Sequence, residues 1–202
     1  MTYSYLALGD SYTIGELVPL LDSFPYQTIQ ILRRILPASV HFTAPEIIAK
    51  TGWTTDELEF AISTTTFLPK YNMVSVLIGV NNQYRGRSVE NYKQEFEKLL
   101  SVAIRFAGDN TKSVFVISIP DWGVTPFAEG KDRDLIAKEI DLYNDACKKI
   151  TEDHRCNYID ITTSQRADGN KVEFLATDGL HPSAAEYGKW AEQLSAQVLL
   201  TF

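Results

Sequence analysis

The chain has 202 residues, with 19 basic and 26 acidic side chains, so its formal net charge is −7. This length predicts one domain over residues 1–202, and the acidic balance argues against nucleic acid as a partner, because a phosphate-binding protein needs a basic face. The 45% hydrophobic content excludes an intrinsically disordered chain. No apolar run approaches the ~20 residues of a transmembrane helix, and the N-terminus lacks a signal-peptide pattern, so we expect a cytoplasmic protein.

Short apolar segments recur along the chain and are bounded by polar or glycine residues. A strand buried on both faces reads as such a run, because neither face alternates with polar residues. Four segments fit this description, and a fifth, weaker one leads to Ile47 and Ile48; in chain order they are 5–8, 40–44, 73–78, 114–119 and 158–161.

Helical patterns lie between these segments. Apolar residues recur at three- and four-residue steps over 89–103, 136–150 and 187–198, and 25–35 is a further helix candidate. Thr54 with Glu57 and Ser183 with Glu186 both fit the capping box that starts a helix. Alternating strands and helices predict a parallel sheet covered on both faces, a three-layer α/β/α sandwich with five strands.

Four polar clusters follow the predicted strands or precede the last helix. They are Gly9-Asp10-Ser11-Tyr12, Thr51-Gly52-Trp53, Gly79-Val80-Asn81-Asn82 and Asp178-Gly179-Leu180-His181-Pro182. Ligands of an open parallel sheet bind beyond the carboxyl ends of its strands, where these clusters would meet.

The residue types in the clusters suit acyl transfer. A serine such as Ser11 needs a base to take its proton, and His181 suits neutral pH. Asp178, three residues earlier, would orient that histidine and stabilise its charged form. Donors for a developing oxyanion would be the N–H groups of Ser11 and Gly52 and the amide of Asn81.

The four blocks, in this order and spacing, resemble those of the SGNH/GDSL hydrolase family. The resemblance implies a flavodoxin-like fold and ester hydrolysis through an acyl-serine. It assigns Ser11 as nucleophile, His181 as base and Asp178 as its orienting acid, with Ser11, Gly52 and Asn81 forming the oxyanion hole. Two residues depart from the family pattern. Tyr12 replaces a leucine, and Asn82 stands where aspartate is more usual, which puts any role for a carboxylate there in doubt.

Each residue also has a purely structural interpretation. Ser11 would serve as a helix cap, and Gly52 would supply a positive φ before the next helix. Asn81 and Asn82 would make an Asx-turn, and Asp10 would brace its turn through backbone N–H groups. The joint presence of all four blocks favours the catalytic interpretation.

The remaining polar residues indicate neither a metal nor a cofactor. His41 and His154 have no metal-ligand spacing, and Cys147 and Cys156 read as buried thiols, Cys147 with a packing role. Thr13 stands where the nucleophile elbow of α/β-hydrolases needs glycine.

Candidate walls of a substrate pocket follow two of the strands. One is Tyr84, Arg85 and Arg87, for which a solvated loop is an equal interpretation, and the other is 121–127, which contains two aromatic residues.

The leading hypothesis is a serine esterase for a small-molecule ester, with short-chain acyl esters or lysophospholipid-like compounds as substrates. One alternative is a carbohydrate O-acetyl esterase with the same site. Another is a flavodoxin-like binding module, which would make no use of Asp178 and His181. The last is an interaction scaffold with an inactive site, and the intact set of catalytic residue types argues against it.

Overall fold

A five-stranded parallel sheet, in the order β4-β2-β5-β6-β7, forms the centre of the computed structural model, which describes residues 1–201. Its strands are β2 (Tyr5–Asp10), β4 (Glu46–Lys50), β5 (Met73–Leu77), β6 (Val114–Ile117) and β7 (Asn157–Ile159). Every residue of β2, β5 and β6 is buried, as the uninterrupted apolar runs predict. The prediction of a five-stranded parallel α/β fold is therefore confirmed.

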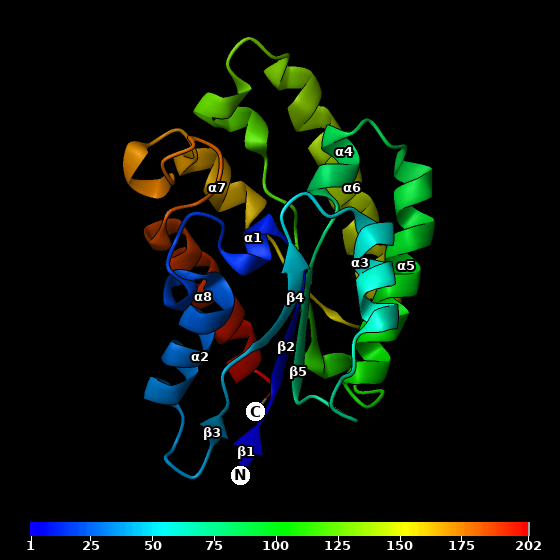
Figure 1. Cartoon of the computed structure of the whole chain (residues 1–202), viewed down its shortest axis with the longest axis vertical. Helices are drawn as coiled ribbons and strands as arrows, with labels where there is room; N and C mark the ends of the chain where they lie inside the picture. Colours follow the sequence, from blue (N-terminus) through cyan, green and yellow to red (C-terminus); the bar gives the residue numbers. More distant parts are fainter. Residues whose placement is uncertain (202) are drawn as a thin grey trace.

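Helices cover both faces of this sheet (Figure 1). On one side lie α2 (Phe24–Ile35), α7 (Thr162–Asp168) and α8 (Ala184–Leu199). On the other lie α3 (Thr55–Thr64), α5 (Val89–Phe106) and α6 (Arg133–Asp153). The long helices bury the faces that their periodicity predicts, and Tyr92, Phe96 and Leu99 of α5 are at most 1% exposed. Shorter elements connect them: α1 (Ser11–Ile14), α4 (Val80–Tyr84) and the 3₁₀ turns η1 (Leu20–Asp22), η2 (Thr111–Ser113), η3 (Trp122–Val124), η4 (Pro126–Ala128) and η5 (Val172–Phe174).

The prediction of one strand over 40–44 is wrong. The segment contributes only β3 (His41–Phe42), which pairs with β1 (Thr2–Tyr3) in a separate two-stranded sheet. The edge strand of the main sheet is β4, which begins after Pro45 and pairs with β2. Proline has no N–H to donate to a ladder, so it separates the two pairings.

Of the two predicted capping boxes, only the one at Thr54 forms, where Glu57 Oε2 accepts the Thr54 N–H at 2.9 Å. Ser183 is the N-cap residue of α8, but its hydroxyl donates to the Glu173 carbonyl at 2.7 Å. Glu186 instead accepts from the indole N–H of Trp190 at 2.9 Å. The prediction of the second box is therefore wrong, because Ser183 bonds to a neighbouring turn and Glu186 bonds to Trp190, one turn further along α8.

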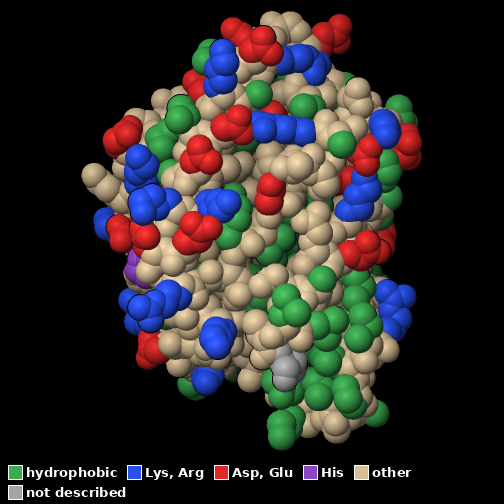
Figure 2. Space-filling view, turned by 180° about the vertical axis from the view of Figure 1, so that it is seen from behind, with side chains coloured by type: hydrophobic (Ala, Val, Ile, Leu, Met, Phe, Trp, Pro, Cys, Tyr) green, Lys and Arg blue, Asp and Glu red, His purple; other side chains and the backbone are tan. Residues whose placement is uncertain are grey.

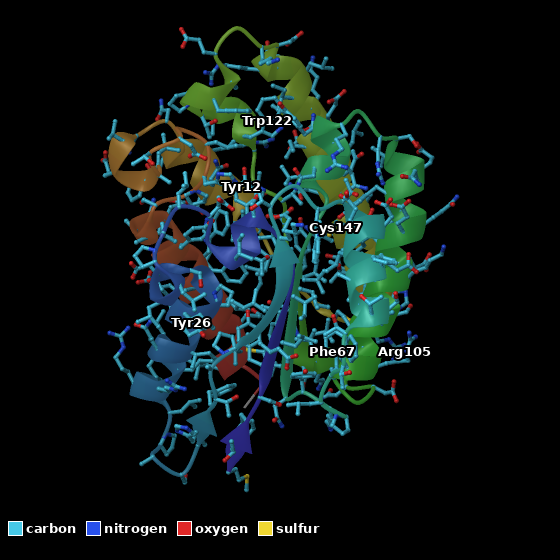
Figure 3. All side chains as sticks on the ribbon, viewed as in Figure 1. Tyr12, Tyr26, Phe67, Arg105, Trp122 and Cys147 are labelled. Atoms are coloured by element: carbon cyan, nitrogen blue, oxygen red, sulfur yellow. The ribbon has the colours of Figure 1, made fainter. Side chains whose placement is uncertain are left out.

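The surface carries the charged side chains, and the two cysteines lie wholly or partly inside the protein. Figure 2 shows acidic and basic side chains interspersed over the back of the molecule, while hydrophobic side chains gather towards one end of that face. Cys147 is a buried free thiol in the helical layer, as predicted (Figure 3). Cys156 is also a free thiol but is only half-buried, so the prediction of a buried thiol is wrong for this residue. Within residues 1–201, no helix has the length and apolar character needed to cross a membrane.

Candidate active site

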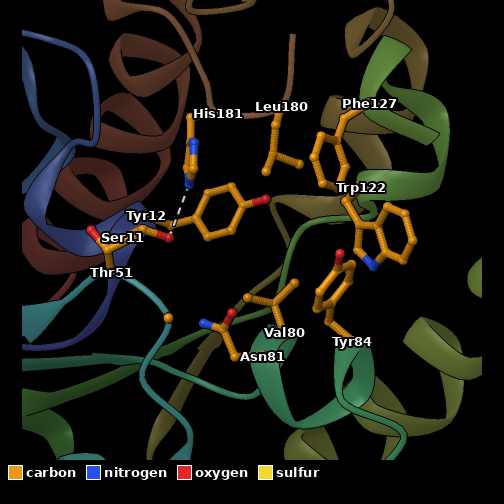
Figure 4. Close-up of a pocket in the computed structure, with 11 residues that line it drawn as sticks. Ser11, Tyr12, Thr51, Val80, Asn81, Tyr84, Trp122, Phe127, Leu180 and His181 are labelled. Carbon is orange, nitrogen blue, oxygen red and sulfur yellow. Dashed lines mark hydrogen bonds between the residues drawn. The ribbon is translucent and has the colours of Figure 1, made fainter. Parts of the chain in front are cut away.

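One pocket lies beyond the carboxyl ends of the central strands, where the sheet order places β2 between β4 and β5 (Figure 4). The chain winds first to β4 on one side of β2 and then to β5 on the other, which opens a crevice at this edge. All four predicted blocks contribute to the pocket; its lining residues are Ser11, Tyr12, Thr51, Gly52, Val80, Asn81, Tyr84, Trp122, Phe127, Leu180 and His181.

The turn after β2 places Ser11 at the edge of the sheet. A Cβ on Gly9 would overlap the Thr13 hydroxyl and the Leu77 carbonyl oxygen, so only glycine lets β2 and β5 pair closely here. Asp10 is the N-cap residue of α1, and its Oδ1 accepts the Tyr12 N–H at 3.0 Å. Ser11 is thus the first helical residue, and the capping role considered for it belongs to Asp10.

Ser11, His181 and Asp178 form a continuous hydrogen-bonded chain. The Ser11 hydroxyl lies 3.0 Å from His181 Nε2, and His181 Nδ1 lies 2.6 Å from Asp178 Oδ2. A carboxylate only accepts hydrogen bonds, so Nδ1 carries the proton and Nε2 is left to accept from Ser11. The structure therefore brings together the three residues predicted for catalysis, in the tautomer that general-base catalysis requires.

The loop before α8 holds the carboxylate in place. Asp178 Oδ1 accepts the backbone N–H groups of Leu180 and His181, each at 3.0 Å. Burial raises the pKa of Asp178, but its bonds to the imidazole and to these N–H groups outweigh burial and leave the pKa below its ordinary value. Asp178 is accordingly ionised at neutral pH.

Tyr12 supports the imidazole from the side. Its ring centroid lies 5.1 Å from that of His181 and 6.2 Å from that of Trp190 in α8. Burial, followed by the charge of Asp10, raises the pKa of Tyr12, so its hydroxyl stays protonated. The tyrosine that replaces the usual leucine therefore packs against His181 and also lines the pocket (Figure 4).

Both predicted oxyanion donors outside the first block reach the pocket. Gly52 has φ +83°, which favours glycine, and its carbonyl oxygen accepts from Arg85 at 2.6 Å. Asn81 Nδ2 donates to the Trp53 carbonyl at 3.0 Å and to Asp10 Oδ2 at 3.3 Å. An amide nitrogen has two hydrogens, so donation to an oxyanion would replace one of these bonds, and the longer bond to Asp10 is the weaker.

Asp10 is a fully buried carboxyl behind the site. Burial raises its pKa to about 7, although the Tyr12 N–H and the Asn81 amide act in the opposite direction. The structure agrees with the bracing role predicted for Asp10 and adds a bond to Asn81 that the sequence does not reveal.

Asn82 does not line the pocket. Its oxygen accepts the Thr55 N–H at 3.1 Å, and its amide donates to the Thr55 hydroxyl at 2.6 Å. Because Thr55 is the first residue of α3, Asn82 fixes the start of that helix. The departure from the usual aspartate therefore alters the support of α3 rather than the pocket.

Both predicted wall segments reach the pocket, but the two arginines of the first segment do not. Tyr84, Trp122 and Phe127 line the pocket, as expected for these two segments. Arg85 and Arg87 do not line it, and pair instead with Glu57 at 3.3 Å and Asp56 at 2.6 Å. For the arginines, the solvated-loop interpretation holds.

Gln83, which sequence analysis missed, supports the wall. Its side-chain oxygen accepts the Trp122 indole N–H at 2.7 Å, and its amide donates to Glu139 at 2.7 Å. Glutamine is usually exposed, and only its 5% exposure in the fold distinguishes Gln83.

Fold and side-chain arrangement together are those of an SGNH-type hydrolase. The model of the GDSL-like lipase/acylhydrolase family matches residues 7–189, and the chain belongs to this family. It is accordingly a hydrolase that acts on ester bonds, rather than the flavodoxin-like binding module considered as an alternative.

Solved structures with the same fold include both lipolytic and carbohydrate-active enzymes. A lipase/acylhydrolase from Enterococcus faecalis has a TM-score of 0.75 at 17% identity, covering 97% of this chain and 95% of that one. Axe2, an acetylxylan esterase from Geobacillus stearothermophilus, has a TM-score of 0.75 at 18% identity, covering 97% and 94%. A member of the lipolytic G-D-S-L family from Veillonella parvula has 0.66 at 17%, covering 100% and 98%. At these identities the similarity establishes the fold. No curated protein matches the chain.

Proposed function

We propose that this protein hydrolyses carboxylic esters through an acyl-serine intermediate on Ser11. The observation that carries the proposal is the unbroken chain of hydrogen bonds from Asp178 through His181 to Ser11, with separations of 2.6 and 3.0 Å, beside a pocket that Ser11 and His181 line. Proposed substrates are short-chain acyl esters or lysophospholipid-like compounds.

Acylation begins when Ser11 Oγ attacks the ester carbonyl carbon and passes its proton to His181 Nε2. Asp178 stabilises the imidazolium that forms, because its Oδ2 accepts from Nδ1. The carbonyl oxygen becomes an oxyanion, which accepts from the N–H groups of Ser11 and Gly52 and from Asn81 Nδ2. The intermediate collapses when His181 returns the proton to the leaving alcohol oxygen.

Deacylation repeats these steps with water. His181 takes a proton from a water molecule as that water attacks the acyl carbon. The second tetrahedral intermediate expels Ser11 Oγ, which regains the proton from His181, and the carboxylic acid is released. Every proton and the acyl group in these steps is accounted for by Ser11, His181, the ester and water.

The test is turnover of p-nitrophenyl esters by wild type and by Ser11→Ala, together with labelling by a fluorophosphonate. We expect Ser11-dependent hydrolysis and a covalent label on Ser11 alone. A Ser11→Ala variant that retained full esterase activity would refute the assignment. Mass spectrometry of the labelled peptide locates the reacting residue independently of the substrate chosen.

A carbohydrate O-acetyl esterase is a second candidate with the same chemistry. Two aromatic side chains at the pocket, Tyr84 at 53% and Phe127 at 42% exposure, offer surfaces against which a sugar ring can stack. The fold shared with an acetylxylan esterase agrees with this candidate. Comparing acetylated xylo-oligosaccharides with p-nitrophenyl acetate separates the two, since a carbohydrate esterase would prefer the sugar ester.

A further inference from the structure

The pocket beside Ser11 has room for one small group. Its volume is about 170 Å³, close to the roughly 150 Å³ of an apolar cavity that binds benzene in another protein. Pockets for drug-sized ligands are larger, at about 300–1,000 Å³. A group of roughly six carbon atoms would therefore fill the space.

Three aromatic rings form one side of the pocket as a wall. The Tyr84 centroid lies 5.3 Å from that of Trp122 and 6.3 Å from that of Phe127, and Trp122 and Phe127 are 6.0 Å apart. Rings at these distances pack on one another and leave no gap between them for an ammonium group, as an aromatic cage would require. Among the described residues that line the pocket, none is Lys, Arg, Asp or Glu. The wall therefore suits an uncharged group.

The wall is held in position by the surrounding structure. Gln83 accepts from the Trp122 indole at 2.7 Å and is itself bound to Glu139 of α6 at 2.7 Å. The Phe127 N–H donates to the Gly179 carbonyl at 3.0 Å, which joins the wall to the loop that carries Asp178 and His181. These bonds fix the separation between the wall and the proposed nucleophile, so a longer chain meets a preformed barrier.

The chemistry indicates which part of an ester faces this wall. The tetrahedral carbon bears four groups: Ser11 Oγ, the oxyanion, the leaving oxygen and the acyl chain. The leaving oxygen must stay beside His181 Nε2 to receive its proton, and the oxyanion must face Gly52 and Asn81. The acyl chain takes the remaining direction, across the pocket from His181, where Figure 4 shows Trp122, Phe127 and Tyr84.

Building on the proposed function, we propose that the pocket accepts one compact, uncharged acyl group of about six carbons, and that Trp122, positioned by Gln83, sets its length limit. Lysophospholipids with long acyl chains are then poor substrates. Butyrate, hexanoate and benzoate esters are good ones, because each acyl group fits between Ser11 and the wall.

The experiment measures kcat/KM for p-nitrophenyl acetate, butyrate, hexanoate, octanoate, palmitate and benzoate with wild type, Trp122→Ala and Phe127→Ala. We expect the wild-type optimum at butyrate to hexanoate, with benzoate accepted. Trp122→Ala should raise the octanoate-to-butyrate ratio by about tenfold or more, since each methylene in an apolar pocket is worth about that factor. Phe127→Ala should shift the ratio in the same direction. Because Phe127 is 42% exposed, this variant keeps the test valid if Trp122→Ala does not fold.

Phe60→Ala is the matched control, since Phe60 is 71% exposed on α3 and does not line the pocket. A wild-type optimum at palmitate, or an unchanged ratio in both wall variants, would overturn the length limit. The length limit would also be overturned if, in a series of acetate esters of different alcohols, the wall variants changed the preference for the alcohol. Fluorophosphonate labelling distinguishes failure of the length limit from failure of the proposed function. A labelled Ser11 with the wrong chain-length profile overturns only the length limit, whereas an unlabelled Ser11 overturns the proposed function as well.

Discussion

Replacing Asp178 by asparagine tests the orientation of the proposed base. Asp178 Oδ1 accepts two backbone N–H groups, from Leu180 and His181, so an oxygen must remain at that position in the variant. The new amide NH₂ must then occupy the Oδ2 position, 2.6 Å from His181 Nδ1. Because this NH₂ donates, Nδ1 has to accept and the ring proton moves to Nε2. Nε2 can then no longer accept the proton of Ser11.

The expected loss is large because the backbone forbids the amide from turning over. A histidine locked in the wrong tautomer lowers kcat by about 10⁴ in serine proteases, which corresponds to about 5 kcal/mol in the activation barrier. Stability should change little, because the asparagine oxygen still accepts the Leu180 and His181 N–H groups. We therefore expect a folded but nearly inactive protein.

The assay is kcat with p-nitrophenyl butyrate, accompanied by thermal unfolding of the same preparations. Asp178→Ala is the matched comparison: it also removes the carboxylate but leaves the tautomer of His181 free. Asparagine should be at least as damaging as alanine, although it preserves more of the native hydrogen bonding. An Asp178→Asn enzyme within tenfold of wild type would refute the argument that the backbone N–H groups fix the amide.

Three further substitutions separate the catalytic from the structural part of the site. Asn81→Ala should lower kcat by about 100–1,000-fold if its amide serves the oxyanion, and a loss below about threefold in the same ester assay would contradict that role. Asp10 has its pKa raised by burial to about 7, so the folded state holds its proton more tightly than the unfolded chain does. Its contribution to the free energy of unfolding is therefore largest below about pH 4 and is lost as pH rises through about 7, by up to about 4 kcal/mol. Urea denaturation across this range should show a flatter pH dependence for Asp10→Asn, and identical slopes would count against it. Asn82→Ala leaves the buried Thr55 N–H unpaired, so it should lower the free energy of unfolding by about 1–3 kcal/mol. Its kcat should be nearly unchanged. A large loss of kcat in the folded variant would instead assign Asn82 to the site.

The sequence by itself determines the layers of the fold and the members of the site. Uninterrupted apolar runs predict buried strands, and three- and four-residue spacing predicts the helices that cover them, because both periodicities are local properties of the chain. Parallel strands carry their carboxyl ends to one edge, so the blocks containing Ser11, Gly52 and Asn81, each of which follows a strand, are predicted to meet there. The Asp178–His181 pair is local as well, since the two residues lie three positions apart in a tight loop.

Tertiary structure decides the partners of these side chains. Asn81 binds Asp10 from 71 positions away, Trp122 binds Gln83 from 39 and Thr55 binds Asn82 from 27. No periodicity encodes such pairs, because they arise only after the sheet has brought separate loops together. A hydrogen bond also depends on separations of a few tenths of an ångström, which packing sets and residue type does not. For the same reason the size of the acyl pocket follows from how three aromatic rings pack, although all three are visible in the sequence.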